Sequence, residues 1–148
     1  MQLQLDLDLP RDKLSVPVIR RVLGDALRTL GVVDDCIDDI QVALSEACTN
    51  VLDHVQAGEI YHVTARIDEE NCVLEVVDKG SGFDDTVHGH ADAVDDAETG
   101  RGIQLMRGLV DSVSFEPRLK GGTVVHLSKG LQFDDGAPGP RLAASEPG

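Results

Sequence analysis

The chain has no tryptophan and few other aromatic residues, since Phe and Tyr together make up only 3% of its 148 residues. Hydrophobic residues account for 41% of the chain, so its core must be built mainly from Leu, Val, Ile and Ala. That fraction is enough for a packed core and argues against general disorder. The length fits one domain and not two.

Basic residues are also scarce, because 13 Lys and Arg stand against 27 Asp and Glu, for a formal net charge of −14. Binding to the phosphate backbone of a nucleic acid needs clustered Lys and Arg, so direct nucleic-acid binding is disfavoured. A basic protein partner, or a nucleotide that arrives with a metal ion, is compatible with this charge.

Long hydrophobic runs and paired cysteines are missing as well. No apolar stretch approaches the length of a membrane span, and the acidic N-terminus is unlike a signal peptide. The three cysteines, Cys36, Cys48 and Cys72, form no CxxC pair and leave one residue over from any disulfide scheme. We therefore expect a cytoplasmic protein with reduced thiols in its core and no membrane contact.

Hydrophobic periodicity predicts the first half of the fold. Alternating leucines predict a strand over residues 3–9, stopped by Pro10. Ser15 is a candidate N-cap for a helix that ends at Gly31, and a second helix is expected from Asp34 to about Val55. The second helix has an apolar stripe at the spacing of one helical face, formed by Ile37, Ile40, Leu44, Ala47, Cys48, Val51 and Val55.

The second half begins with two strands, residues 61–67 and 72–77, which are predicted to form a hairpin. Residues 84–99 are acidic and have little to bury, which is typical of a lid or binding loop. A third helix is expected to open at Gly102, followed by strands over 113–115 and 123–127. The order β-α-α-β-β-α-β-β predicts an α+β fold, a two-layer sandwich with helices on one face of a mixed β-sheet. Residues 1–130 would form this domain, and residues 131–148, rich in Gly, Pro and Ala, a disordered tail.

The second helix carries the first candidate site residues, Glu46 and Asn50. Four residues apart, they are separated by about 40° around the helix axis and point away from the apolar stripe. The amide oxygen of Asn50 suits Mg²⁺, and the carboxylate of Glu46 could orient or deprotonate a hydroxyl. Alone, the pair could equally be a solvated helix face.

The strand ending at Val77 runs into Asp78, followed by Gly80 and Gly82. A carboxylate at a strand end can accept a hydrogen bond from the exocyclic amine of a planar base. The glycines would let the backbone approach the ring closely. A Gly-rich turn without a ligand is the alternative.

Gly100, Arg101 and Gly102 stand at the predicted start of the third helix. Free N–H groups and the positive end of the helix dipole favour a phosphate there, and Arg101 could add a charged contact. A Rossmann motif is excluded because an acidic loop precedes these glycines in place of a strand. A P-loop is excluded because no Gly-Lys-Ser/Thr follows. Thr123, which opens the last strand, could bond near the base or belong to a simple hairpin turn.

Four segments, ALSEACTN (43–50), VVDKGSGF (76–83), GRGIQLM (100–106) and GGTVVHL (121–127), resemble the N, G1, G2 and G3 boxes of the GHKL ATPase superfamily. The resemblance extends from about Leu3 to Lys129. Within that superfamily the chain is most similar to bacterial anti-sigma-factor serine/threonine kinases of the RsbW and SpoIIAB type.

The resemblance implies the cofactors ATP and Mg²⁺. It makes Glu46 the catalytic base and Asn50 the Mg²⁺ ligand, while Asp78 reads adenine. Gly80 and Gly82 would shape the adenine pocket. The phosphates would be met by Gly100, Arg101 and Gly102, with Thr123 near the base.

The same resemblance implies a kinase that phosphorylates a STAS-domain anti-anti-sigma protein, sequesters a sigma factor, and forms a homodimer. An ATP-dependent binding module with little kinase activity and a detached histidine-kinase catalytic domain are the alternatives. The sequence departs from the family in its acidic lid, which lacks Lys, and in Asp53, where histidine kinases usually carry Lys. His88 and His90 lie in that lid and are better explained as solvated residues than as metal ligands.

Overall fold

Five strands and four helices make up the described part of the computed structural model, which covers residues 1–54, 60–78, 97–117 and 123–144. In chain order they are β1 (Gln2–Pro10), α1 (Ser15–Leu30), α2 (Asp34–His54), β2 (Ile60–Asp68), β3 (Asn71–Asp78), α4 (Ala97–Leu109), β4 (Ser112–Pro117), β5 (Thr123–Gly130) and α5 (Pro138–Ala144). Within these residues, no helix is long and apolar enough to cross a membrane.

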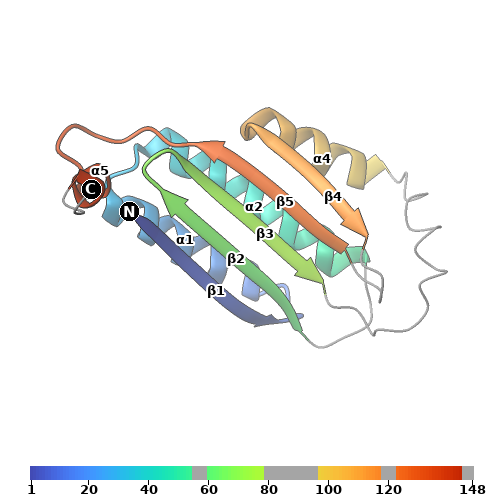
Figure 1. The fold of residues 1–148 in the computed structure, drawn as a ribbon. Coiled ribbons are helices and arrows are strands. Elements are labelled where there is room, and N and C mark those ends of the chain that lie inside the picture. Colours follow the sequence, from blue (N-terminus) through green and yellow to red (C-terminus); the bar gives the residue numbers. More distant parts are fainter. Residues whose placement is uncertain (55–59, 79–96, 118–122, 145–148) are drawn as a thin grey trace.

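The strands form one five-stranded sheet in the order β1-β2-β3-β5-β4, and helices α1, α2 and α4 lie together on one of its faces (Figure 1). The predicted two-layer α+β sandwich is therefore confirmed. The prediction of a mixed sheet needs a correction, because every neighbouring pair among the described strands is antiparallel.

Chain topology gives the reason for the antiparallel sheet. The two helices between β1 and β2 return the chain to the end of the sheet where β1 stopped, so β2 runs back along β1. The connection from β3 through α4 makes β4 parallel to β3, but β5 lies between these two strands and is antiparallel to both. Strands β3 and β4 therefore run in the same direction but are not neighbours in the sheet.

The core lies between the sheet and the helices. Alternate residues of β2 and β3 are buried, and the α2 residues of the predicted stripe from Ile37 to Cys48 are fully buried, with Val51 3% exposed. Val55 lies outside the described residues.

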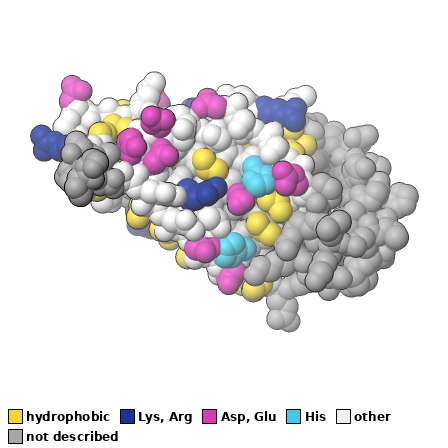
Figure 2. Space-filling view, viewed as in Figure 1, with side chains coloured by type: hydrophobic (Ala, Val, Ile, Leu, Met, Phe, Trp, Pro, Cys, Tyr) yellow, Lys and Arg dark blue, Asp and Glu magenta, His cyan; other side chains and the backbone are white. Residues whose placement is uncertain are grey.

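The other face of the sheet carries charged side chains and histidines, with hydrophobic side chains between them (Figure 2). There His62 bonds to Asp6 and Asp8, and His126 lies between Glu75 and Glu116.

The end of α1 agrees with the sequence prediction, whereas its start does not. Gly31 adopts a left-handed conformation (φ 88°) at the C-cap, which glycine takes without steric cost. Ser15 was the expected N-cap, but it is the first helical residue and its side chain makes no cap bond. Its Oγ instead donates to the carbonyl of Asp12 (2.6 Å) and shares a 2.5 Å hydrogen bond with the hydroxyl of Tyr61.

The prediction of a disordered tail from residue 131 is wrong for residues 131–144. The amide of Val33 donates to the carbonyl of Gln132 (2.9 Å), and the amide of Asp134 donates to the carbonyl of Gly31 (2.8 Å). Ala137 is buried against Gly31, where helix α1 ends. The segment contains two glycines and two prolines and shows no helical or strand periodicity, so its order comes from docking on the rest of the domain. Residues 145–148 lie outside the described residues.

Candidate functional site

Helices α2 and α4 pack together where Glu46 and Asn50 face Gly102. A Cβ atom added to Gly102 would lie 3.1 Å from Oε2 of Glu46 and 3.5 Å from Oδ1 of Asn50. Glycine at this position lets α4 approach the two polar groups without a close side-chain contact. The structure thus brings together three of the predicted site residues from two separate motifs.

Asn50 has a buried polar atom that the protein leaves unsatisfied. Among the described residues, its Nδ2 is the one buried side-chain nitrogen or oxygen without a hydrogen-bond partner. A buried donor left unpaired costs free energy, about 1–3 kcal/mol, and usually marks a place where a ligand or water supplies the acceptor. A phosphate oxygen is such an acceptor.

Asp78 ends β3 and is completely buried. Its Oδ2 accepts a 3.2 Å hydrogen bond from Nη1 of Arg11, whose side chain is 9% exposed. The second terminal nitrogen, Nη2, donates to the carbonyls of Val51 (3.0 Å) and Leu52 (3.2 Å), near the end of α2. A buried carboxyl group paired with an arginine therefore lies at the strand end where the sequence predicted a base-reading acceptor.

Arg11 is the site residue that sequence reasoning missed. Its only local signal is its place directly after Pro10, where β1 ends. Because β1 is two strands away from β3 in the sheet, no short-range pattern connects Arg11 to Asp78.

A second set of buried polar groups lies beside this pair. Tyr61, which is opposite Asp78 in the strand register, is fully buried and bonds to Ser15 and to Cys48. Burial raises the pKa of Tyr61 to about 12 and the pKa of Cys48 to about 12. Both groups are neutral at physiological pH, and Tyr61 lies beside Asp78 in the sheet.

The start of α4 differs from the prediction in a way that changes the role of Gly102. The helix begins at Ala97, so Gly100 lies in its first turn and Gly102 in its second. The free N–H groups at the start of an α-helix end at its third residue, here residue 99, so the N–H of Gly100 already lies within the helix. Gly102 contributes by letting its neighbours approach, because its own N–H lies within the helix. The side chain of Arg101 is outside the described part of the structure.

Thr123 is the first residue of β5, next to Val124, which pairs with Val77. It is half-buried and lies at the same end of the sheet as Asp78. Gly80, Gly82 and residues 84–96 of the predicted lid, His88 and His90 included, lie outside the described residues. Within the described residues, no group of three or more His, Cys, Asp or Glu side chains could hold a metal ion.

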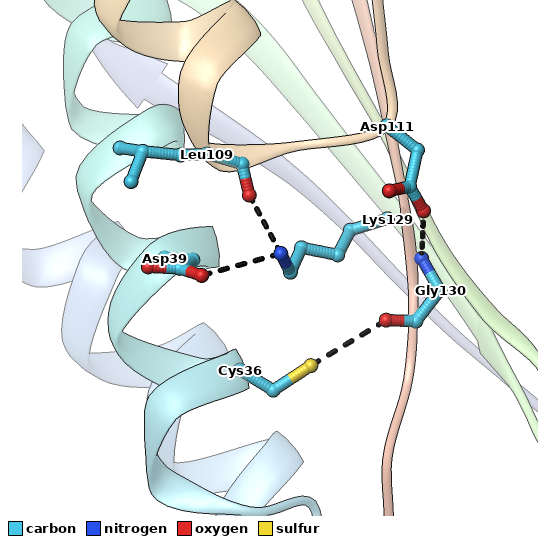
Figure 3. A network of polar contacts seen from close by, with 6 residues as sticks. All are labelled: Cys36, Asp39, Leu109, Asp111, Lys129 and Gly130. Carbon is cyan, nitrogen blue, oxygen red and sulfur yellow. Dashed lines mark hydrogen bonds and ion pairs between the residues drawn. The ribbon is translucent and has the colours of Figure 1, made fainter.

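The far end of α4 is attached to the rest of the domain by a polar network (Figure 3). Nζ of Lys129 on β5 donates to the carbonyl of Leu109 (2.7 Å) and pairs with Asp39 of α2 (3.2 Å). A cation at the last carbonyls of a helix also complements its dipole. The carboxylate of Asp111 accepts from the amide of Gly130 (2.6 Å). This network holds α4 against α2 and thereby helps to keep Gly102 opposite Asn50.

These residues fit a nucleotide with its metal ion. The unpaired Nδ2 of Asn50 offers a donor to a phosphate, while its amide oxygen suits Mg²⁺. At Gly102 the second turn of α4 comes close to Glu46 and Asn50. The buried, ion-paired Asp78 offers an acceptor to an exocyclic amine.

An α+β sandwich with these polar groups at one end of its sheet defines a histidine-kinase-like ATPase domain. The chain belongs to this family, because the family model for the histidine kinase-like ATPase domain matches residues 9–129.

Among individual relatives, the chain is similar to serine-protein kinases named RsbW. It is 30% identical over 140 residues to RsbW of Halalkalibacterium halodurans, with 88% of this chain and 85% of that protein covered. It is 32% identical over 144 residues to RsbW of Bacillus pumilus, with 86% and 85% covered.

A solved structure supports the fold. The RsbU and RsbW domains of Rv1364c from Mycobacterium tuberculosis match 87% of this chain with a TM-score of 0.67 and 22% sequence identity. The match covers 32% of that longer chain.

Proposed function

We propose that this protein is an ATP-dependent serine/threonine protein kinase and anti-sigma factor. The observation that carries the proposal is the approach of Gly102 on α4 to Glu46 and Asn50 on α2, beside an Asn50 amide without a partner. This arrangement suits a phosphate and its metal ion. The similarity to serine-protein kinases named RsbW over most of both chains supports the choice of reaction.

Each site residue has a separate task in this proposal. Asp78 accepts a hydrogen bond from the adenine amine, and Asn50 binds Mg²⁺ through its amide oxygen. Glu46 would accept the proton of the substrate hydroxyl as that oxygen bonds to the γ-phosphorus, while the bond from this phosphorus to the bridging oxygen breaks and ADP leaves. Mg²⁺-ATP, when bound, supplies the phosphoryl group and neutralises part of its charge.

Gly80 and Gly82 shape the adenine pocket, and Thr123 contributes from the adjacent strand β5. Gly100 and Gly102 admit the phosphates, and Arg101 adds positive charge. Phosphoryl transfer depends mainly on positioning and on charge stabilisation, so a site with so few reactive groups is sufficient.

The proposed protein substrate is a STAS-domain anti-anti-sigma protein, and the proposed binding partner is a sigma factor. We also propose a homodimer that pairs through β1 and α1. Two features support that surface. Strand β1 is an edge of the sheet, and Leu14, Val18 and Val22 expose 75%, 56% and 40% of their surfaces along α1. Edge strands and exposed apolar stripes are surfaces that partners cover.

The proposal is tested with purified protein, Mg²⁺-ATP and candidate STAS proteins, by measuring phosphate transfer. Glu46→Gln should retain ATP binding and lose transfer by about 10²–10⁴-fold, the range for a general base. Asp38→Asn is the matched control, because it removes one negative charge from an exposed position on the same helix.

Transfer at the parental rate by Glu46→Gln would show that Glu46 is not the base. ATP binding without transfer to any STAS protein would favour a binding module over a kinase. Failure of the parent protein to bind ATP would refute the whole assignment.

A further inference from the structure

Arg11 occupies an unusual position beside the proposed base-reading carboxylate. It follows the last residue of β1, yet its guanidinium reaches Asp78 at the end of β3 and the last turn of α2. The two charged side chains are 9% and 0% exposed. Arginine presents a rigid fork of donors, so one residue can bond the carboxylate and the helix carbonyls together.

The first consequence of this contact is electrostatic. A carboxyl group buried away from water favours its neutral form unless a cation compensates its charge. A protonated carboxyl carries a donor and no longer acts as an acceptor only, which weakens its preference for an exocyclic amine. Arginine keeps its charge throughout the physiological pH range, so it holds Asp78 in the accepting form.

The second consequence is positional. The carbonyls of Val51 and Leu52, which accept from Arg11, directly follow Asn50 on α2. One guanidinium therefore connects the residue proposed to read the base with the helix proposed to hold the metal ion. The negative end of a helix dipole further favours a cation at this position.

We propose that Arg11 is a positioning residue of the nucleotide site, which sets the preference for a base with an exocyclic amine by keeping Asp78 charged and oriented. This inference rests on the proposed nucleotide-binding function. In this proposal Arg11 does not contact the nucleotide and affects its binding only through Asp78.

The test compares Mg²⁺ complexes of ATP and of purine riboside triphosphate, which lacks the 6-amino group, by titration calorimetry. The parent should prefer ATP by about 10- to 100-fold, the value of one hydrogen bond to a charged group. Arg11→Gln should lower the preference for ATP to nearly that of Asp78→Asn. Its affinity for ATP should fall much more than its affinity for the analogue. The double variant should lose no more of the preference than Asp78→Asn alone.

Two further variants keep the test decisive. Arg28→Gln removes an exposed arginine of α1 and should leave the preference unchanged. Arg11→Lys keeps the charge but replaces the fork by a point charge, so it should retain only part of the preference. Circular dichroism reports whether each variant is folded.

Several results would overturn the inference. If Arg11→Gln weakened both nucleotides equally, Arg11 would be part of the scaffold only. If Arg11→Gln did not fold and Arg11→Lys weakened both nucleotides equally, the conclusion would be the same. A parent that binds neither compound would refute the proposed function itself. A parent with the expected preference and an Arg11→Gln variant that keeps it would refute the role of Arg11 alone.

Discussion

Replacing Gly102 by alanine separates the stability of α4 from the function of the site. Gly102 lies inside the helix, where alanine is the better helix former by about 1 kcal/mol. A backbone effect alone would therefore make the variant more stable than the parent. The same methyl group would enter the space between α4 and the polar face of α2.

The size of the conflict follows from the distances around Gly102. The new Cβ would lie 3.1 Å from Oε2 of Glu46, closer than ordinary van der Waals contact, and 3.5 Å and 3.8 Å from the amide atoms of Asn50. The nearest atom is the end of a flexible side chain, so a shift of a few tenths of an ångström relieves the contact. Stability should change by less than about 1 kcal/mol in either direction.

Binding should respond much more strongly than stability. The methyl group lies against the side chains that we assign to Mg²⁺ and to the substrate hydroxyl, and it displaces Glu46 from its position. We expect Gly102→Ala to weaken Mg²⁺-ATP by at least 10-fold, which corresponds to about 1.4 kcal/mol. Titration calorimetry measures the affinity, and thermal unfolding with and without Mg²⁺-ATP measures the stability.

Gly108→Ala is the matched control in the same helix. A Cβ added at Gly108 meets nothing within 4 Å, so this variant should gain stability and bind the nucleotide like the parent. Parental affinity in Gly102→Ala would refute our reasoning about the contact between α4 and α2. Equal losses of affinity in both variants would show that helix flexibility, and not the added methyl group, controls binding.

Three other predictions test separate parts of the structure. Deletion of residues 131–148 should lower the melting temperature, because residues 131–144 bond to the ends of α1 and α2. An unchanged melting temperature would contradict this contribution to stability. Reversing Arg20 and Arg21, both exposed on α1, to Glu should weaken sigma-factor capture in pull-downs without changing ATP affinity. Burial raises the pKa of Cys48 and Cys72 from 9.0 to about 12. At pH 8 both thiols should therefore be alkylated slowly in the native protein and rapidly in urea, as measured by mass spectrometry.

The raised thiol pKa values also have a consequence for stability against pH. Each pKa is higher in the folded state than in the unfolded state, so the contribution of the neutral thiol is complete below pH 9.0. It is lost as the pH rises from there towards about 12. Urea unfolding midpoints should fall over this range, and Cys48→Ala should reduce the slope of that fall.

Local patterns in the sequence were sufficient to predict most of the helices and strands. The alternating leucines of β1 and the apolar stripe of α2 express the geometry of a single strand and a single helix, so they are readable without the rest of the fold. The same holds for the positions of Glu46 and Asn50 on one side of α2. Asp78 could be placed at a strand end because glycines interrupt the apolar pattern directly after it.

Long-range contacts decided the remaining features. The antiparallel sheet depends on β5 lying between β3 and β4, which no local pattern specifies. Residues 131–144 contain glycines and prolines and lack a regular apolar pattern, so their order was not predicted; it arises when they dock on the ends of α1 and α2. The start of α4 at Ala97, five residues before Gly102, was also not predicted.

Sequence alone therefore determined the class of the fold, the helix that carries Glu46 and Asn50, and the place of Asp78 at a strand end, because each depends on residues close together in the chain. Only the tertiary structure showed that Gly102 lies against Glu46 and Asn50 and that Arg11 holds Asp78. Gly102 is more than 50 positions away from Glu46 and Asn50 in the sequence, and Arg11 is 67 positions away from Asp78. Such pairs meet because hydrophobic burial packs the helices on the sheet, and the polar groups at its end are brought together by that packing.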